Sequence, residues 1–182
     1  MKKLIIIGGI TVALIALAAI IMRSYTKSFS PADTAKYETD NFSIEVNYCR
    51  PYKKGRQIFG ELVPYGEVWR TGANEPTTIT VNQAISIKNN DLEPGTYSLW
   101  TIPQEDTWTV ILNSDVPGWG VKVPSGKANR NPESDVLSID VPAIQTQDLF
   151  EQFTISFDQM KEELDMVIMW ENTLVVVPIQ NN

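Results

Sequence analysis

The stretch TYSLWTIPQEDTWTVILN, from Thr96 to Asn113, holds two aromatic-rich runs separated by Pro103-Gln104-Glu105-Asp106. β-Branched and aromatic residues favour strands, and a short polar segment that begins with proline favours a turn between them. The length of the segment is typical of a hairpin loop. We therefore predict a β-hairpin from residues 96–102 and 107–113.

Runs of the same kind continue on both sides of this hairpin, with turn-forming residues between them. Beyond residue 36, no stretch of a dozen residues has a convincing helical period. Several runs are apolar on successive residues, which is expected of strands covered on both faces. Together they predict an all-β fold of the β-sandwich or jelly-roll-like type. The ten expected strands are residues 42–48, 57–63, 77–81, 84–88, 96–102, 107–113, 136–141, 153–157, 164–170 and 174–179.

Two of the expected turns lie near the middle and the end of the chain. Asn89-Asn90-Asp91 follows the fourth run, and Glu171-Asn172-Thr173 lies between the last two runs. Asn and Asp favour turns because their side chains hydrogen-bond to the nearby backbone. We therefore expect strands to end at both places, and residues 148–152 to form at most one helical turn.

At the N-terminus, the segment from Leu4 to Met22 contains no charged residue. As a helix it spans about 28 Å, the thickness of the hydrocarbon core of a bilayer. We expect residues 1–23 to form a single uncleaved membrane anchor; the alternative is a signal peptide cleaved near Ala16-Leu17-Ala18, which releases a secreted domain. Lys2 and Lys3 favour a cytoplasmic N-terminus and an extracytoplasmic, periplasmic C-terminal domain.

Composition and length indicate how the rest of the chain is organised and which ligands it disfavours. Residues 24–36 are mostly small or polar, which predicts a linker, and residues 37–182 have the length of one β-sandwich domain. Beyond Arg23 there are 12 Lys and Arg against 22 Asp and Glu, a net charge of −10. This charge argues against non-specific binding of nucleic acid or anionic lipid.

The sequence contains one cysteine, Cys49, and no histidine. The absence of histidine excludes the usual Ser-His and Cys-His catalytic arrangements and most zinc sites. Cys49 is therefore expected to pack in the core, and we expect no metal site and no cofactor.

Basic residues concentrate between Arg50 and Arg70, where five Lys and Arg accompany two Glu. This segment runs into EVWRTGANEPTTITV, residues 67–81. Trp69 is expected to bury its ring, and Gly72 permits a positive φ. A loop that exposes backbone N–H groups beside Arg70 suits an anion such as a carboxylate or phosphate.

The segment YCRPYKKGRQIFGELVPYGEVWRTGANEPTTITV, residues 48–81, together with GTYSLWTIP, WTVILN and WENT further on, resembles a bacterial envelope family described as domain of unknown function 2911. The resemblance covers about residues 37–179. It implies a secreted or anchored β-rich protein. It implies no particular activity and no catalytic residue.

We expect a site for a small anionic or sugar-like ligand, or for an envelope partner. Glycines lie between Arg50, Arg56 and Arg70. They allow chain reversals that bring the three guanidinium groups together. The expected function is that of a membrane-anchored extracytoplasmic binding module. The candidate ligand-binding residues are Arg50, Arg56, Arg70, Asn74 and Glu75.

Two alternatives remain open. In the first, the arginines are internal partners of Glu61, Glu67 and Glu75, and the domain is a purely structural envelope module. In the second, the chain is a histidine-independent acid–base enzyme that uses Arg70, Asn74 and Glu75, with Glu61 and Glu75 as a carboxylate pair. A pocket that holds Arg70 and Asn74 without a nearby carboxylate favours binding. Glu61 and Glu75 facing each other favour catalysis.

Overall fold

The computed structural model describes residues 2–160 and 163–181. A helix is followed by nine strands, with a short 3-10 turn before the eighth, so the all-β prediction behind one N-terminal helix is confirmed. The elements are α1 (Lys2–Ser28), β1 (Ala32–Glu38), β2 (Ser43–Cys49), β3 (Thr77–Val81), β4 (Ile85–Ile87), β5 (Asn90–Leu92), β6 (Gly95–Ile102), β7 (Thr107–Asn113), η1 (Pro132–Ser134), β8 (Asp135–Met160) and β9 (Glu163–Asn181).

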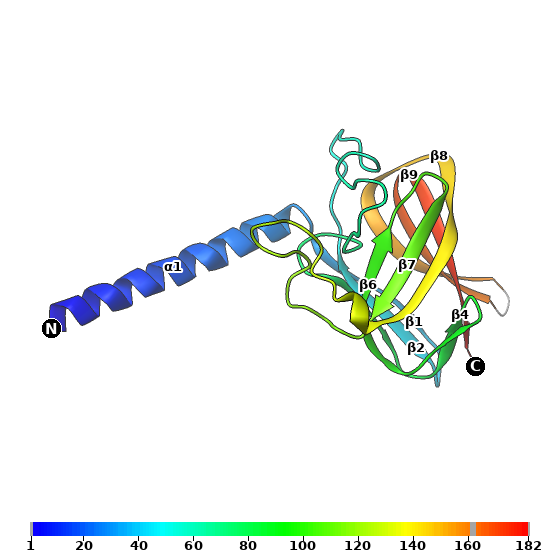
Figure 1. The fold of residues 1–182 in the computed structure, drawn as a ribbon, viewed down its shortest axis with the longest axis horizontal. Helices are drawn as coiled ribbons and strands as arrows, with labels where there is room; N and C mark the ends of the chain where they lie inside the picture. Colours follow the sequence, from blue (N-terminus) through cyan, green and yellow to red (C-terminus); the bar gives the residue numbers. More distant parts are fainter. Residues whose placement is uncertain (1, 161–162, 182) are drawn as a thin grey trace.

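The nine strands form one sheet in the order β1-β2-β3-β6-β7-β8-β9-β4-β5, and each neighbouring pair is antiparallel (Figure 1). The predicted hairpin is β6–β7. β8 and β9 are long, with 26 and 19 residues. β8 pairs with β7 up to Pro142 and with β9 from Ala143 onward, so this one strand serves both halves of the sheet.

Contacts between the first strands and the far half of β8 close the fold. The hydroxyl of Tyr48, on β2, donates to the carbonyl of Ile155 at 3.1 Å and accepts from the N–H of the same residue at 3.0 Å. The hydroxyl of Tyr37, on β1, hydrogen-bonds to Gln159 at 2.9 Å. Because β3, β6 and β7 lie between β2 and β8 in the sheet, these contacts show that the sheet folds back on itself as a sandwich does.

Five aromatic rings pack together inside the sandwich: Phe59, Trp69, Trp108, Phe153 and Trp170. Trp69 stacks on Trp170 with 5.9 Å between ring centroids and 18° between ring planes. Phe59 meets Trp108 edge-on at 4.9 Å. Buried aromatic rings each remove roughly 150–250 Å² from water, so this cluster is a large part of the hydrophobic core.

Residues 57–63 do not form the expected strand. Gly60 adopts a φ of 88°, and Phe59 and Val63 form an isolated bridge that closes a tight turn. The N–H groups of Ile58 and Phe59 donate to the carboxylate of Glu171 instead of to a neighbouring strand. Apolar residues recur here because Ile58, Phe59 and Val63 are buried from within a loop.

Both expected turns are also different in the structure. Lys88 and Asn89 have φ values of 49° and 63° and make a two-residue hairpin turn, so Asn90 and Asp91 are free to pair with β4. Glu171 has a φ of 57° but forms an irregularity inside β9 rather than an end to it. The last four expected strands are therefore two, β8 and β9, and residues 148–152 lie within β8.

The expected linker over residues 24–36 is mostly regular structure. α1 continues to Ser28, and β1 pairs along its whole length with β2, from Ala32 opposite Cys49 to Glu38 opposite Ser43. β1 is an edge strand whose side chains are largely exposed, so its sequence lacks the apolar alternation that marks a half-buried strand. Residues 29–31 alone connect helix and sheet.

α1 is long and apolar enough to cross a membrane. An 18-residue stretch within Ile6–Ser28 has a mean hydropathy of 2.3, and none of that stretch is buried against the protein. Figure 1 shows the helix extending away from the sheet. Among the described residues no other helix has these properties. The expected membrane-spanning helix is thus present as a helix of suitable length and composition.

Asp135 ties the start of β8 to two neighbouring segments. Its carboxylate accepts from the side chain of Asn113 at 2.7 Å and from both Nε and an Nη of Arg130, and the side chains of Arg130 and Asp135 are only 15% and 20% exposed. Burial raises the pKa of Asp135, but these hydrogen bonds and the charge of Arg130 outweigh it, so the pKa lies below its ordinary value of 3.8.

We predict that Asp135→Asn lowers the free energy of unfolding by about 2–3 kcal/mol at pH 7, because Arg130 loses its partner. Since the folded-state pKa is depressed, the contribution is present above the ordinary pKa and is lost as pH falls through the folded pKa. Urea unfolding of both chains from pH 7 to pH 2 measures the difference. Asp91→Asn, at an exposed position of β5, is the control and should change stability by less than about 0.5 kcal/mol. A difference that stays constant down to pH 2 would contradict the assignment.

Candidate functional site

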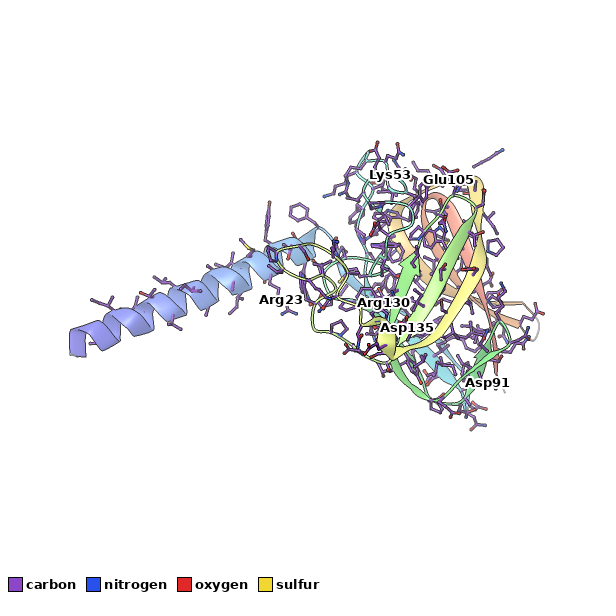
Figure 2. All side chains as sticks on the ribbon, in the orientation of Figure 1. Arg23, Lys53, Asp91, Glu105, Arg130 and Asp135 are labelled. Atoms are coloured by element: carbon purple, nitrogen blue, oxygen red, sulfur yellow. The ribbon has the colours of Figure 1, made fainter. Side chains whose placement is uncertain are left out.

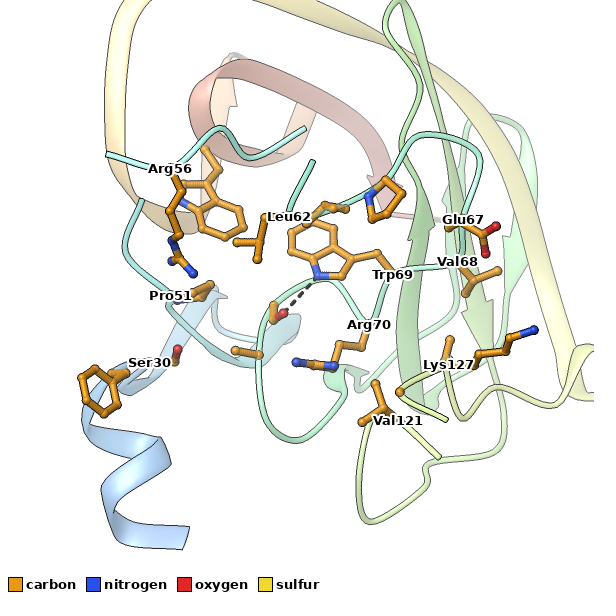
Figure 3. A pocket seen from close by; sticks show the side chains of 18 of the residues that line it. Ser30, Pro51, Arg56, Leu62, Glu67, Val68, Trp69, Arg70, Val121 and Lys127 are labelled. Atoms are coloured by element: carbon orange, nitrogen blue, oxygen red, sulfur yellow. Dashed lines mark hydrogen bonds between the residues drawn. The ribbon is translucent and has the colours of Figure 1, made fainter. Parts of the chain in front are cut away.

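A cavity of about 920 Å³ lies at the end of the domain from which α1 leaves (Figure 3). Three segments line it: residues 29–30 after α1, the long loop from Pro51 to Ala73, and the loop from Val121 to Ala128. Trp170 of β9 adds a fourth wall. The volume of the cavity is at the upper end of the ~300–1,000 Å³ typical of small-molecule sites.

The turn that follows Trp69 directs the next residue into this cavity. Trp69 forms two backbone hydrogen bonds with Thr101 of β6, at 2.7 and 3.0 Å, and its indole Nε1 donates to the carbonyl of Gly72 at 3.1 Å. Thr71 and Gly72 have φ values of 53° and 146°. A Cβ on Gly72 would lie 3.0 Å from the carbonyl oxygen of Cys49, so glycine is needed both for the conformation and for the close approach.

Arg70 is the residue that this turn presents to the cavity (Figure 3). Its aliphatic stem packs against Gly120, where an added Cβ would lie 2.3 Å from Cδ of Arg70. Its guanidinium has no hydrogen-bond or ion-pair partner among the described residues, and its Nε is buried. Burial lowers the pKa of Arg70 from its ordinary value. The protein thus places a poorly solvated cation in a cavity without supplying a counter-ion.

A second buried donor without a partner belongs to the same cavity. Among the side chains that the structure describes, the buried nitrogen and oxygen atoms lacking a hydrogen bond are Arg70 Nε and Trp170 Nε1. Both residues line the cavity, and both atoms can only donate. Buried polar groups in proteins are nearly always satisfied, so each of these two donors is an exception among the described side chains.

Positive charge dominates the cavity wall. Four cationic side chains line it, with one carboxylate, that of Glu67, which is exposed. Arg56 also donates from its guanidinium to the backbone carbonyls of Tyr52 and Lys53, so it both lines the cavity and holds its loop. The four cationic residues are Lys54, Arg56, Arg70 and Lys127.

Arg50 is not part of the cavity. It forms an ion pair with Asp33 of β1 at 2.9 Å and donates to the carbonyl of Phe153 at 3.1 Å and the hydroxyl of Thr154 at 2.7 Å. It therefore joins β1 to β8 as a structural clamp. Of the three arginines expected to meet, the structure brings Arg56 and Arg70 to one cavity and places Arg50 elsewhere.

Asn74 and Glu75 lie behind the cavity wall. Asn74 has a φ of 60°. Its side-chain amide donates to the carbonyl of Ser30 at 3.4 Å, and its backbone carbonyl accepts from the N–H of Gly120 at 3.3 Å. Glu75 forms ion pairs with Arg23 at 2.5 Å and Lys27 at 2.9 Å. Both residues therefore connect the lining segments to one another and to α1.

The carboxylates do not show the arrangement that an acid–base enzyme requires. Burial raises the pKa of Glu75, but hydrogen bonds from Lys27 and Arg23 outweigh it and the pKa is lowered, so this carboxyl is held ionised. Glu61 is exposed, and neither it nor Glu75 lines the cavity. The structural alternative expected Glu75 to pair with one of the three arginines. Its partners are instead Arg23 and Lys27.

Cys49 is a packed thiol. Its side chain is buried, and burial raises the pKa of the thiol. Because the thiolate is the reactive form, this environment disfavours nucleophilic chemistry. The expectation that Cys49 packs in the core is confirmed.

Sequence reasoning missed the contribution of the WENT motif to this site. Trp170 is a cavity wall, and the carboxylate of Glu171 accepts from the N–H groups of Ile58 and Phe59 and pairs with Lys53 at 3.2 Å. The motif contributes to the family resemblance, but the contact joins residues more than 100 positions apart, and no local feature of either segment predicts it.

Arg50 and Arg70 offer a matched pair of substitutions. We predict that Arg50→Gln lowers the free energy of unfolding by about 2–3 kcal/mol, because it removes the ion pair with Asp33 and leaves the Phe153 carbonyl without its guanidinium donor. Arg70→Gln should stay within about 1 kcal/mol of the unmodified chain, since it removes a partly buried cation that the protein does not pair. Urea unfolding of the detergent-solubilised chain, followed by tryptophan fluorescence, compares the two. A loss of 3–5 kcal/mol for Arg70→Gln would show that it acts as a clamp.

Residues 30–179 match the protein family described as "Protein of unknown function (DUF2911)". The matched range begins within the short connection before β1, contains β1 to β8 entire, and ends within β9, so it includes the cavity apart from Phe29. Neither a curated protein nor a solved structure gives a significant match. The chain belongs to this family of unknown function.

Proposed function

We propose that the cavity binds a small organic anion with an apolar portion, which makes the chain a membrane-anchored binding module. The observation that carries the proposal is the guanidinium of Arg70, which has no partner among the described residues and lies in a cavity that Trp170, with its own buried and unpartnered N–H, also lines. A carboxylate or phosphate accepts from a planar guanidinium through two parallel hydrogen bonds, which no neutral ligand can match.

The apolar portion of the ligand is inferred from the rest of the wall. Trp69 and Trp170 stack against each other beneath the cavity, and Leu62, Val63 and Val68 add aliphatic surface. An apolar pocket with a few convergent polar groups is the usual form of a small-molecule site. In such surroundings an ion pair with Arg70 is less screened than at an open surface.

A thermal and urea-unfolding screen tests this proposal. The full chain, in phosphatidylcholine nanodiscs, is compared with and without hexanoate, hexyl phosphate, neutral hexanol, and maltose as a neutral sugar. We predict stabilisation by the two anions only, reaching about 2.7 kcal/mol at a hundredfold excess over Kd. Arg70→Gln should abolish it, whereas Arg50→Gln should keep it on a lower basal stability.

The screen has two outcomes that contradict the proposal. Equal stabilisation of the unmodified chain and Arg70→Gln by an anion would show that the cavity arginine is not the binding group. Stabilisation by maltose that is insensitive to Arg70→Gln would indicate a neutral sugar ligand instead.

The domain is further proposed to lie outside the cytoplasm. Lys2 and Lys3 precede the apolar helix, and basic residues are retained preferentially on the cytoplasmic side. In a bacterial host, alkaline phosphatase fused after Asn182 should therefore be active. Replacing Lys2 and Lys3 together by Glu should increase the inverted fraction, because Arg23 and Lys27 then outweigh the N-terminal side. Strong activity of a cytoplasmic reporter at the same position, with inactive phosphatase, would reverse the orientation.

A further inference from the structure

We infer that the anion is the headgroup of a membrane amphiphile, an inference that rests on the proposed function. This amphiphile has a carboxylate or phosphate head and an acyl chain. It reaches the cavity from the surface of the bilayer that α1 crosses.

The height of the cavity above the bilayer follows from the helix. Met22 is the last residue of the uncharged run, and Phe29, which lines the cavity, is seven residues further on. At 1.5 Å per residue this is roughly 10 Å along the helix axis. The headgroup layer on each side of a bilayer is about 5–8 Å thick. The nearest wall of the cavity therefore begins at the outer boundary of the headgroups.

The domain is held to the helix at this level. Glu75 pairs with Arg23 and Lys27 at 2.5 and 2.9 Å, and the guanidinium of Arg23 lies 6.0 Å from the ring centroid of Trp119. Arg23 is the first charged residue after the apolar run, so Glu75 and Trp119 lie beside the headgroups. Tryptophan is enriched at this depth in membrane proteins.

Apolar side chains are exposed at the same end. Phe29 and Leu62, both of which line the cavity, are 44% and 45% exposed, and Val123, in the loop that forms another wall, is 84% exposed. An acyl chain that leaves the cavity past Phe29 and Leu62 remains in apolar contact on its way to the bilayer. A wholly water-soluble anion gives these exposed side chains no such role.

Charge is strongly asymmetric along the domain. Residues 50–76 and 114–131, the two loop regions at the helix end, contain eight Lys and Arg against three Glu and one Asp, while the rest of residues 24–182 contains four against 18 Asp and Glu. Figure 2 shows Arg23 beside these loops and Asp91 at the opposite end of the domain. An anionic surface attracts the first end and repels the second. The overall charge of −10 opposes non-specific adsorption, whereas this asymmetry favours one anionic headgroup at the cavity.

The test uses the full chain in phosphatidylcholine nanodiscs that contain a fixed mole fraction of either palmitoyl lysophosphatidic acid or palmitoyl lysophosphatidylcholine. These two probes have the same chain and differ in headgroup charge. Native mass spectrometry of the released protein measures the 1:1 adduct. We expect at least tenfold more adduct with the anionic probe, and loss of that difference in Arg70→Gln.

Two further arms separate a lipid from a free anion. Val123→Gln, at an exposed rim position that does not line the cavity, should reduce the lysophosphatidic acid adduct about tenfold while leaving hexanoate-dependent stabilisation within twofold, because each apolar methylene contributes up to about 4-fold in affinity. Leu149→Gln, at a 59% exposed position on β8 that does not line the cavity, is the matched control and should change neither. Glycerol phosphate, the headgroup without the chain, should fail to displace the lipid at equal concentration.

The outcomes distinguish this inference from the proposed function. Displacement of the lipid by equimolar glycerol phosphate, or hexanoate binding without any lysolipid adduct, would overturn the lipid assignment and leave anion binding standing. Equal adducts with both lysolipids in the unmodified chain and in Arg70→Gln would also overturn it. If neither hexanoate, hexyl phosphate nor lysophosphatidic acid binds, both proposals fail.

Discussion

The arrangement of this domain depends most on the hydrogen bonds that the carboxylate of Glu171 accepts from the backbone of Ile58 and Phe59. Glu171 sits at a positive φ inside β9, where the long strand pair β8–β9 is irregular, and its side chain accepts from the backbone of Ile58 and Phe59. This fixes the loop from Pro51 to Val63 over the sheet. The residue before it, Trp170, stacks on Trp69. One irregular position in a strand therefore holds the loop in place. It also positions the stacked rings of Trp69 and Trp170, which line the cavity.

The arginines illustrate how burial decides the role of a charged residue. Arg50 and Arg130 have carboxylate partners and further hydrogen bonds, so the cost of removing their charges from water is offset within the protein. Among the residues that the structure describes, Arg70 has neither, although it is partly buried and its pKa is lowered by that burial. A group that opposes stability in this way is expected at a functional position, where a ligand supplies the missing interaction.

The sequence predicted the all-β class, an N-terminal helix long and apolar enough to cross a membrane, and the β6–β7 hairpin because these depend on local composition and periodicity. It did not predict β1, since an exposed edge strand has no apolar alternation, or the loop character of residues 57–63, where the burial of Ile58 and Phe59 imitates a strand. At the site, Arg70 stood out through its neighbours Trp69 and Gly72. Arg50 could not be separated from it, because the distinction lies in Asp33 and Phe153, which are remote in sequence.

Several unusual features meet at one end of the molecule. Among the described residues six non-glycine residues have a positive φ, and three of them, Lys54, Thr71 and Asn74, belong to the segment that lines or supports the cavity. Such conformations cost free energy and persist only where surrounding contacts impose them. The same end of the domain has the unpaired donors, the excess of basic residues and the ion pairs to α1. Because these features arise from loops and a helix far apart in the chain, their coincidence at the helix end of the domain favours the proposed shared site over independent packing compromises.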